Sequence, residues 1–188
     1  MAVSHHRLIL HPRDPFFVPE TTAVLEGLRE IGFVGPALDA CRYRVGSRFM
    51  EWVSFLGCSP WLRLEPDAQQ TPFTHIHVPH QTPVPILIAG DNVKPPRCPH
   101  CRKGFMAPGR PPRPPPDPTA VSRCASCGTP APWSALDWRR SACVARWRLE
   151  VTEIHEAEAV PTPGLLDRLA ALSAGRPWGY CYVQTRKG

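Results

Sequence analysis

Two Cys-x-x-Cys pairs are the residues of this chain whose type and spacing point most directly to chemistry. The first pair lies in "CPHC" and the second in "CASC", which gives Cys98, Cys101, Cys124 and Cys127. A turn that carries Cys-x-x-Cys directs both sulfurs to one point, so two such turns can build a tetrahedral site. Thiolates are soft ligands, and Zn²⁺ suits the site because it imposes no geometric preference of its own. The spacing therefore predicts one metal ion held by these four cysteines, with Zn²⁺ favoured and iron as the alternative.

The same two pairs resemble the paired knuckles of zinc-ribbon proteins. The resemblance covers only about residues 95–133, and we identify no family for the chain as a whole. It implies that the four cysteines bind a structural Zn²⁺, because four protein ligands leave no position open for a substrate or a water. The link "MAPGRPPRPPPDPTA" departs from the family, since it is too rich in proline for the paired strands of many ribbons. An extended loop is expected there instead.

The composition favours metal binding over disulfide bonds for these cysteines. The sequence contains no run of about 18 apolar residues of the kind that spans a membrane. Its first residues, "MAVSHHRLILHPRDP", lack the long apolar stretch of a signal peptide. A cytoplasmic protein is therefore expected, and in that compartment thiols stay reduced.

Positive charge is concentrated around the paired cysteines. Residues 94–148 contain eleven basic and two acidic residues, although the whole chain has a formal net charge of only +6. Most of the basic residues are arginine, which makes bidentate contacts to carboxylates and phosphates. The sequence therefore predicts a basic, partner-binding surface. Its candidate residues are Arg102, Lys103, Arg110, Arg113, Arg139, Arg140, Arg146 and Arg148.

Two kinds of partner fit such a surface. Trp133 and Trp138 lie among the basic residues, and basic side chains with aromatic rings can bind nucleic acid by phosphate contact and base stacking. The same charges fit an acidic protein surface equally well. We favour a protein partner because no base-reading module is recognisable, and nucleic acid stays open. A simpler alternative is that the metal only stabilises a segment, because residues 94–128 contain few apolar residues beyond Phe105, Met106 and Val121.

His75 and His77 form the main rival site. They stand two apart in "FTHIHV", so a strand would place both on one face, roughly 6.6 Å apart. Two imidazoles can share a metal if a third ligand joins them, and His80, His155 and Glu51 are candidates. Such an open site would make the chain a metal-dependent enzyme, whereas the favoured hypothesis is a non-enzymatic binding or adaptor protein. The simpler interpretation of the two histidines is a polar strand face.

The remaining reactive residues give weaker indications. Cys58 lies on the turn "GCSP" and could be an exposed nucleophile, but no base can be assigned to it. Cys41, Cys143 and Cys181 are expected in the core, where free cysteines are usually found. The stretch "GRPPRPPPDP" could dock as a polyproline helix, but a spacer between the cysteine pairs is the simpler interpretation. The sequence has no Gly-rich phosphate loop, no GxSxG and no HExxH.

Apolar periodicity predicts two helices. The first is expected within residues 19–33, where Thr21 or Thr22 can cap its start. The second is expected within residues 162–175, with Thr162 as the cap and a proline in the first turn.

Alternation of apolar and polar residues predicts the strands. It is clearest over residues 143–152, where Arg146 and Arg148 would point to a solvent-exposed face of the sheet. Residues 41–56 fit either an extended segment or a helix. The other expected strands are 7–11, 61–65, 73–78, 85–90 and 178–183.

The order of these elements predicts an α+β fold. Strand-helix units stand at both ends of the chain with strands between them, which favours a mostly antiparallel sheet with two helices on one face. A ferredoxin-like arrangement is the expected topology. Residues 1–93 and 136–188 would together form this domain, and residues 94–135 would be an inserted zinc-binding module with a proline-rich loop.

Overall fold

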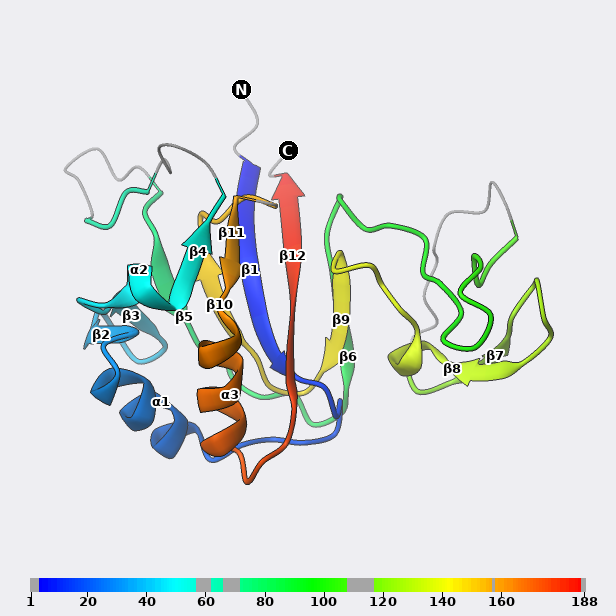
Figure 1. Cartoon of the computed structure of the whole chain (residues 1–188), viewed down its shortest axis with the longest axis horizontal. Coiled ribbons are helices and arrows are strands. Elements are labelled where there is room, and N and C mark those ends of the chain that lie inside the picture. Colours follow the sequence, from blue (N-terminus) through cyan, green and yellow to red (C-terminus); the bar gives the residue numbers. More distant parts are fainter. Residues whose placement is uncertain (1–3, 57–61, 66–71, 108–116, 157, 187–188) are drawn as a thin grey trace.

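The structure is a computed structural model of the chain. It describes residues 4–56, 62–65, 72–107, 117–156 and 158–186. Figure 1 shows a sheet with helices against one face and, beside the sheet, a smaller part built from loops and the two short strands β7 and β8. The paired cysteines belong to this smaller part.

The central element is a six-stranded sheet in which all neighbouring strands are antiparallel. Its strand order is β12–β1–β10–β5–β3–β2. Strand β1 pairs with β12 over its whole length and with β10 on its other side. The six strands are β1 (Ser4–Pro12), β2 (Val34–Ala37), β3 (Arg42–Val45), β5 (His75–His77), β10 (Leu149–Thr152) and β12 (Trp178–Arg186).

Three antiparallel strand pairs and four helical segments complete the described structure. The pairs are β4 (Val53–Phe55) with β11 (Ala159–Pro161), β6 (Ile86–Ala89) with β9 (Ala142–Ala145), and β7 (Val121–Arg123) with β8 (Pro130–Pro132). The helical segments are α1 (Thr21–Glu30), the single turn α2 (Phe49–Trp52), the 3-10 turn η1 (Trp133–Ala135) and α3 (Pro163–Ala171).

This topology confirms the predicted α+β class. If the hairpin β2–β3, the turn α2, the pair β4–β11 and the segment between β5 and β10 are set aside, the chain runs β1–α1–β5–β10–α3–β12. The four strands then lie in the order β12–β1–β10–β5, which is the β-α-β-β-α-β arrangement of ferredoxin-like folds. The hairpin β2–β3 extends the sheet beyond β5. The segment between β5 and β10 carries both cysteine pairs.

Helices α1 and α3 cover one face of the sheet (Figure 1), because the apolar stripe of each helix needs a partner surface. Leu28 of α1 and Leu165 of α3 are fully buried in one cluster with Leu8 of β1. Trp147 is buried in the same cluster and packs edge-on against Trp178, with ring centroids 5.6 Å apart. The main core therefore lies between these helices and the sheet.

The two longer helices begin at different kinds of cap. Thr162 caps α3, as predicted. Helix α1 is capped by Glu20, whose carboxylate accepts hydrogen bonds from two backbone amides of the first turn. The predicted cap at Thr21 or Thr22 is wrong, because the Thr21 hydroxyl accepts a hydrogen bond from the indole of Trp147 instead. None of the helices in the described ranges has the length and apolar character needed to cross a membrane.

The opposite face of the sheet is partly apolar and partly polar. The β6–β9 strand pair covers β1 and β12, and there Ile88 and Cys143 are buried together with Ile9, Cys181 and Val183. Farther along the sheet, β10, β5 and β3 present polar side chains on this face. This polar area includes the two histidines of the rival site.

Two of the strand predictions need correction, and the structure decides a third that was left open. Residues 143–152 form two strands, β9 and β10, because the chain bends at Arg146, whose backbone N–H donates to the Pro15 carbonyl. The described residues 62–65 are not a strand. Residues 41–56 contain both predicted alternatives, since β3, α2 and β4 follow one another there.

Candidate metal centre

The two Cys-x-x-Cys turns have the same backbone geometry. In the first turn, the Arg102 amide donates to the Cys98 carbonyl over 3.0 Å, and in the second the Gly128 amide donates to the Cys124 carbonyl over 2.9 Å. The amide of each leading cysteine also donates to a carbonyl just beyond its turn. The residue after each pair has a positive φ, 62° at Arg102 and 72° at Gly128. Each turn therefore holds its two sulfurs in the same way.

The four sulfurs lie where one metal ion can reach all of them. Cys98 Sγ is 3.8 Å from Cys127 Sγ, and Cys101 Sγ is 3.8 Å from Cys124 Sγ. All four sulfurs lie within 4.8 Å of one another. A tetrahedron with Zn–S bonds of about 2.3 Å has sulfurs about 3.8 Å apart, so these separations fit a central metal. The described cysteines are all free thiols, so the four sulfurs are available as ligands.

The surroundings of the sulfurs differ. A backbone hydrogen bond with Lys103 lowers the pKa of Cys101, but desolvation and hydrogen bonds with the other three cysteines outweigh it and raise that pKa to about 11. Cys98 and Cys124 are buried, whereas Cys127 is exposed. The Ser126 amide donates to Cys124 Sγ over 3.3 Å. The hydroxyl of Thr129 lies 3.4 Å from Cys127 Sγ, and hydrogen bonding to Thr129 lowers the pKa of Cys127 to about 6. A thiolate at neutral pH is the form that coordinates a metal ion.

The metal-binding part has a small core of its own. Phe105, Trp133 and Trp138 are buried together with two of the cysteines. The expectation of few apolar residues concerned residues 94–128, and the two tryptophans that complete this core lie beyond that range. Val121 itself is 66% exposed. The predicted role of the two tryptophans in base stacking is wrong, because Trp133 is only 6% exposed and Trp138 only 5%. Their rings pack against each other, with centroids 5.8 Å apart.

Backbone hydrogen bonds join the two turns to each other and close the base of the metal-binding part. We call the described residues 94–107 and 117–140 the clasp. The Ala125 amide of the second turn donates to the Phe105 carbonyl, which follows the first turn. Arg97 and Asp137 exchange two backbone hydrogen bonds, of 2.8 and 3.1 Å, where the chain enters and leaves the clasp. The predicted module boundaries at 94 and 135 stay a prediction, and the buried cluster of the clasp continues to Ala142 in β9.

A matched pair of substitutions tests the geometry of the two turns. Arg102 has a backbone conformation that costs a non-glycine residue about 1 kcal/mol, so Arg102→Gly should stabilise the clasp by up to about that amount. Gly128→Ala should destabilise it by about 1 kcal/mol, because its φ is positive while no atom within 4 Å would meet the added Cβ. Zinc-competition titration with a chelator, combined with thermal unfolding, measures both changes. Opposite signs are expected, and equal effects of both variants would contradict the shared geometry.

Basic side chains are exposed around the cysteines. Arg102, Lys103 and Arg139 are exposed, and none forms an ion pair with a carboxylate of the described residues. Arg140 is exposed as well, and its guanidinium lies 4.5 Å from the ring centroid of Tyr180. These four candidates are therefore accessible to a partner. The candidates Arg110 and Arg113 lie outside the described residues.

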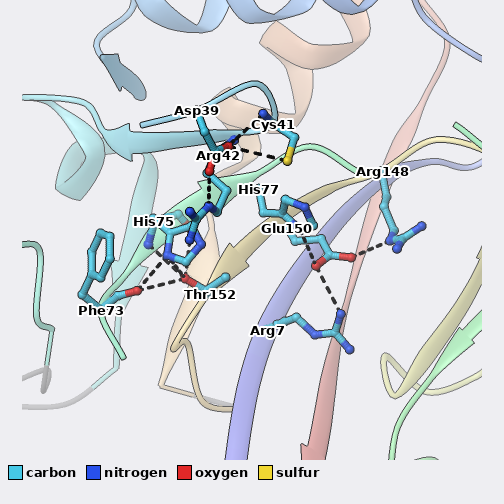
Figure 2. Close-up of polar contacts among 10 residues, drawn as sticks. All are labelled: Arg7, Asp39, Cys41, Arg42, Phe73, His75, His77, Arg148, Glu150 and Thr152. Atoms are coloured by element: carbon cyan, nitrogen blue, oxygen red, sulfur yellow. Dashed lines mark hydrogen bonds and ion pairs between the residues drawn. The ribbon is translucent and has the colours of Figure 1, made fainter. Parts of the chain in front are cut away.

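The last two basic candidates make internal contacts instead. Arg146 is half-buried, and its Nε donates to the Thr82 carbonyl over 2.9 Å. Arg148 is 16% exposed, and its Nε donates to the Glu150 carboxylate over 2.6 Å (Figure 2). The predicted wet strand face is wrong here, because the chain bends between β9 and β10. We therefore leave both arginines out of the basic surface.

Glu150 is the centre of a charged network that sequence reasoning did not find. Its side chain is 2% exposed and lies 3.2 Å from Arg7, 2.6 Å from Arg148 and 3.3 Å from His77. Figure 2 shows these side chains converging on the carboxylate from β1, β5 and the segment before β10. Burial alone would raise the pKa of Glu150, but the hydrogen bond with His77 and the charges of Arg7 and Arg148 lower it to about 2. Glu150 is thus ionised and links three neighbouring strands.

The rival site at His75 and His77 gains no third ligand from the residues that the structure describes. His77 Nδ1 lies 3.3 Å from Glu150, and His75 Nδ1 lies 3.0 Å from both the Phe73 carbonyl and the Thr152 hydroxyl (Figure 2). Over the described ranges, the four cysteines are the only group of three or more possible ligands close enough to share a metal ion. The two histidines therefore serve the polar contacts of this sheet face, and a metal bound there stays a prediction.

The other cysteines within the described ranges do not form a second reactive centre. Cys143 and Cys181 are buried, as predicted. Cys41 was expected in the core but is half-exposed in a turn, where its Sγ lies 3.7 Å from the Asp39 carboxylate. Desolvation and the charge of Asp39 raise the pKa of Cys41, which disfavours it as a nucleophile. Cys58 lies outside the described residues.

Comparison with known proteins adds no relative. A scan against family models finds no match, and searches of the curated proteins and the solved structures find none either. The class of protein is therefore defined by the fold and the site themselves: an α+β protein with a group of four cysteines that can hold a metal ion.

Proposed function

We propose that this chain is a non-enzymatic binding or adaptor protein. Its four-cysteine site would hold a structural Zn²⁺, and its clasp would present a basic surface to an acidic protein partner. The sulfur separations of 3.8 Å and the resemblance of both turns to zinc-ribbon knuckles support zinc. With four protein ligands the ion has no open coordination position, so its role is to hold the two turns together.

The observation that carries the proposal is a contrast in ion pairing between the two parts of the molecule. Arginines of the α+β domain are commonly neutralised, as in the pairs Arg7–Glu150, Arg42–Asp39, Arg44–Glu65, Arg48–Glu51, Arg168–Glu30 and Arg176–Asp14. In the clasp, Lys94 pairs with Glu156. The other basic residues of the described clasp are exposed and pair with no described carboxylate: Arg97, Arg102, Lys103, Arg123, Arg139 and Arg140.

The metal site does not neutralise this charge. The described clasp has seven basic residues against Asp117 and Asp137. Four thiolates with Zn²⁺ contribute about −2, so the clasp keeps a positive charge with the metal bound. Unpaired guanidinium groups on a small rigid part of the molecule attract a negatively charged partner and bind carboxylates bidentately.

A protein partner fits this surface better than nucleic acid. Proteins that bind single strands without a reading module rely on exposed aromatic rings for stacking. Phe105, Trp133 and Trp138 are all buried, and the described clasp exposes no other phenylalanine, tyrosine or tryptophan. The surface therefore offers charge and hydrogen bonds without a stacking platform, which suits aspartate and glutamate side chains of a partner.

Removing the charge of the clasp tests the proposal. The triple variant Arg102→Gln, Lys103→Gln, Arg139→Gln should weaken capture of the partner by about tenfold, because each lost charge removes a favourable interaction at the interface. The measurement is affinity capture on the immobilised, zinc-loaded full chain, with bound proteins identified and quantified by mass spectrometry. Capture should fall with rising salt and should survive nuclease treatment.

A second triple variant provides the matched control. Arg48→Gln, Arg168→Gln, Arg176→Gln removes the same charge from arginines that are paired with carboxylates in the α+β domain, so capture should be nearly unchanged. Equal loss in both variants would show that net charge alone governs capture. Loss of all captured protein after nuclease treatment would make nucleic acid the partner and would overturn the protein assignment.

A further inference from the structure

A cleft of about 410 Å³ lies where the clasp meets the edge of the sheet. Its walls come from the ends of β1 and β12, from β9 and from the segment that follows η1. The polar and aromatic side chains that line it include His11, Arg13, Asp137, Trp138, Arg140 and Tyr180. A cleft of this volume is within the range that binds small ligands or a short piece of chain.

Gly179 and Tyr180 of β12 line the cleft, and this strand is an edge of the six-stranded sheet. Most of its outward backbone groups are already paired. The Tyr182 amide donates to the Arg140 carbonyl, and the Tyr182 carbonyl accepts from Asn92. The Gln184 amide and carbonyl pair with the loop that contains Asn92, and the Trp178 carbonyl accepts from Arg13 Nε. These contacts protect the edge against pairing with another strand.

Tyr180 is the gap in this protection. Backbone groups of a strand alternate between its two neighbours, so the N–H and C=O of Tyr180 point outward like those of Tyr182 and Gln184. Neither group has a hydrogen-bond partner within the part of the chain that the structure describes. The gap opens into the cleft, since Tyr180 and its neighbour Gly179 both line it. One donor and one acceptor are therefore available there to an extended chain.

Two guanidinium groups flank the gap. Arg13 lies on one side, where its Nε is bound to the Trp178 carbonyl over 3.2 Å. Arg140 lies on the other side, with its guanidinium over the ring of Tyr180. Neither arginine forms an ion pair with a described carboxylate.

The cleft as a whole is therefore positive. Asp137 is its one described carboxylate, and an oxygen of that group accepts a hydrogen bond from the Arg139 amide over 2.9 Å. Desolvation lowers the pKa of His11 to about 4, so this imidazole is neutral at pH 7. Two arginines against one carboxylate favour an anionic occupant.

We propose that this cleft binds an extended acidic peptide segment, whose backbone pairs with Tyr180 and whose aspartate or glutamate side chain contacts Arg13 and Arg140. The inference rests on the proposed function and deepens it, because it names where an acidic protein partner is held and in which conformation. Pairing with a sheet edge supplies backbone hydrogen bonds, and the arginines supply the preference for an acidic side chain. The unpaired stretch of this strand edge is short, so one residue of the partner makes the backbone hydrogen bonds to Tyr180.

The test uses a fluorescein-labelled hexapeptide of alternating glutamate and valine, acetylated and amidated at its ends, with the zinc-loaded full chain. Fluorescence anisotropy should show binding that is lost when glutamine replaces glutamate in the peptide. Arg13→Gln and Arg140→Gln should each weaken binding about tenfold, since each removes a charge-assisted hydrogen bond. Arg29→Gln is the matched control, because Arg29 is also exposed and also lies over a tyrosine ring, that of Tyr43, but does not line the cleft, and it should change binding less than twofold.

Amide hydrogen exchange provides a readout that needs no variant. Exchange of the Tyr180 amide should slow when the acidic peptide is added, and the Gln184 amide should be unaffected because it is already paired. An unprotected Tyr180 amide, or equal weakening by Arg29→Gln and Arg140→Gln, would overturn the cleft proposal and leave the clasp proposal standing. Absence of any binding by the acidic peptide would also overturn the cleft proposal. The clasp proposal is tested separately, by the capture measured with the charge-depleted clasp variant, its control variant and nuclease treatment.

Discussion

Replacing Cys98 with serine is expected to abolish zinc binding and unfold the clasp, while the α+β domain stays folded. Cys98 is fully buried between the two turns, and its sulfur is one of the four ligand atoms. Structural zinc contributes roughly 10–16 kcal/mol to folding in small zinc domains, which matches or exceeds the total stability of an ordinary domain. The buried hydrophobic cluster of the clasp is small, so it cannot replace the lost free energy of zinc binding.

Two measurements check this expectation. Metal analysis after dialysis should give one zinc per chain in the parent protein and none in Cys98→Ser. Hydrogen exchange resolved by peptide should show fast exchange throughout the clasp and unchanged protection in β1 and β12. Cys41→Ser is the matched control, because Cys41 is a half-exposed thiol outside the four-sulfur group, and it should keep both the zinc and the protection. A Cys98→Ser variant that retains zinc and a protected clasp would contradict the proposed ligand set.

Replacing Glu150 with glutamine is expected to destabilise the α+β domain by about 3 kcal/mol at pH 7. The carboxylate is 2% exposed and lies between the guanidiniums of Arg7 and Arg148. Removing one partner of a buried ion pair leaves its counterpart charged and uncompensated, which is costly. Urea unfolding of the zinc-loaded protein, followed by tryptophan fluorescence, measures the change. Glu51→Gln is the matched control, because Glu51 pairs with Arg48 at the surface and is 57% exposed, so its loss should cost less than about 1 kcal/mol.

The effect of Glu150→Gln should also depend on pH. The folded-state pKa of Glu150 is about 2, below its ordinary value of 4.5, so the folded state favours the ionised form. Its contribution is therefore fully present above about pH 4.5 and is lost as the pH falls toward 2. The difference in stability between the parent and the variant should shrink over that window. A difference that stays constant from pH 6 to pH 3 would show that the Glu150 charge is not what stabilises the network.

The cysteine group could be predicted from sequence because its geometry is local. A Cys-x-x-Cys turn is defined by a few consecutive residues, and two such turns have one common use in a chain of reduced thiols. The order of the elements could be predicted for a similar reason. Leu28 and Leu165 lie on apolar stripes, and the same stripes pack α1 and α3 against the sheet. Both features depend on residues that are near each other in the sequence.

The features that could not be predicted depend on residues far apart in the sequence. Glu150 looked like a polar residue on a wet face, and it is buried because Arg7 of β1 and His77 of β5 lie on the strands beside it. The bend that splits residues 143–152 depends on a backbone hydrogen bond to Pro15, which no local pattern reveals. The two tryptophans of the clasp show no periodicity, so their burial against each other was not visible either.

Zinc K-edge X-ray absorption of the purified protein tests the central claim most directly. If one ion holds the two turns together, the spectrum should be fitted by four sulfur ligands at about 2.3 Å and by no nitrogen or oxygen ligand. A zinc site with fewer than four sulfurs would contradict that claim, and so would metal-free protein whose clasp is fully protected from hydrogen exchange.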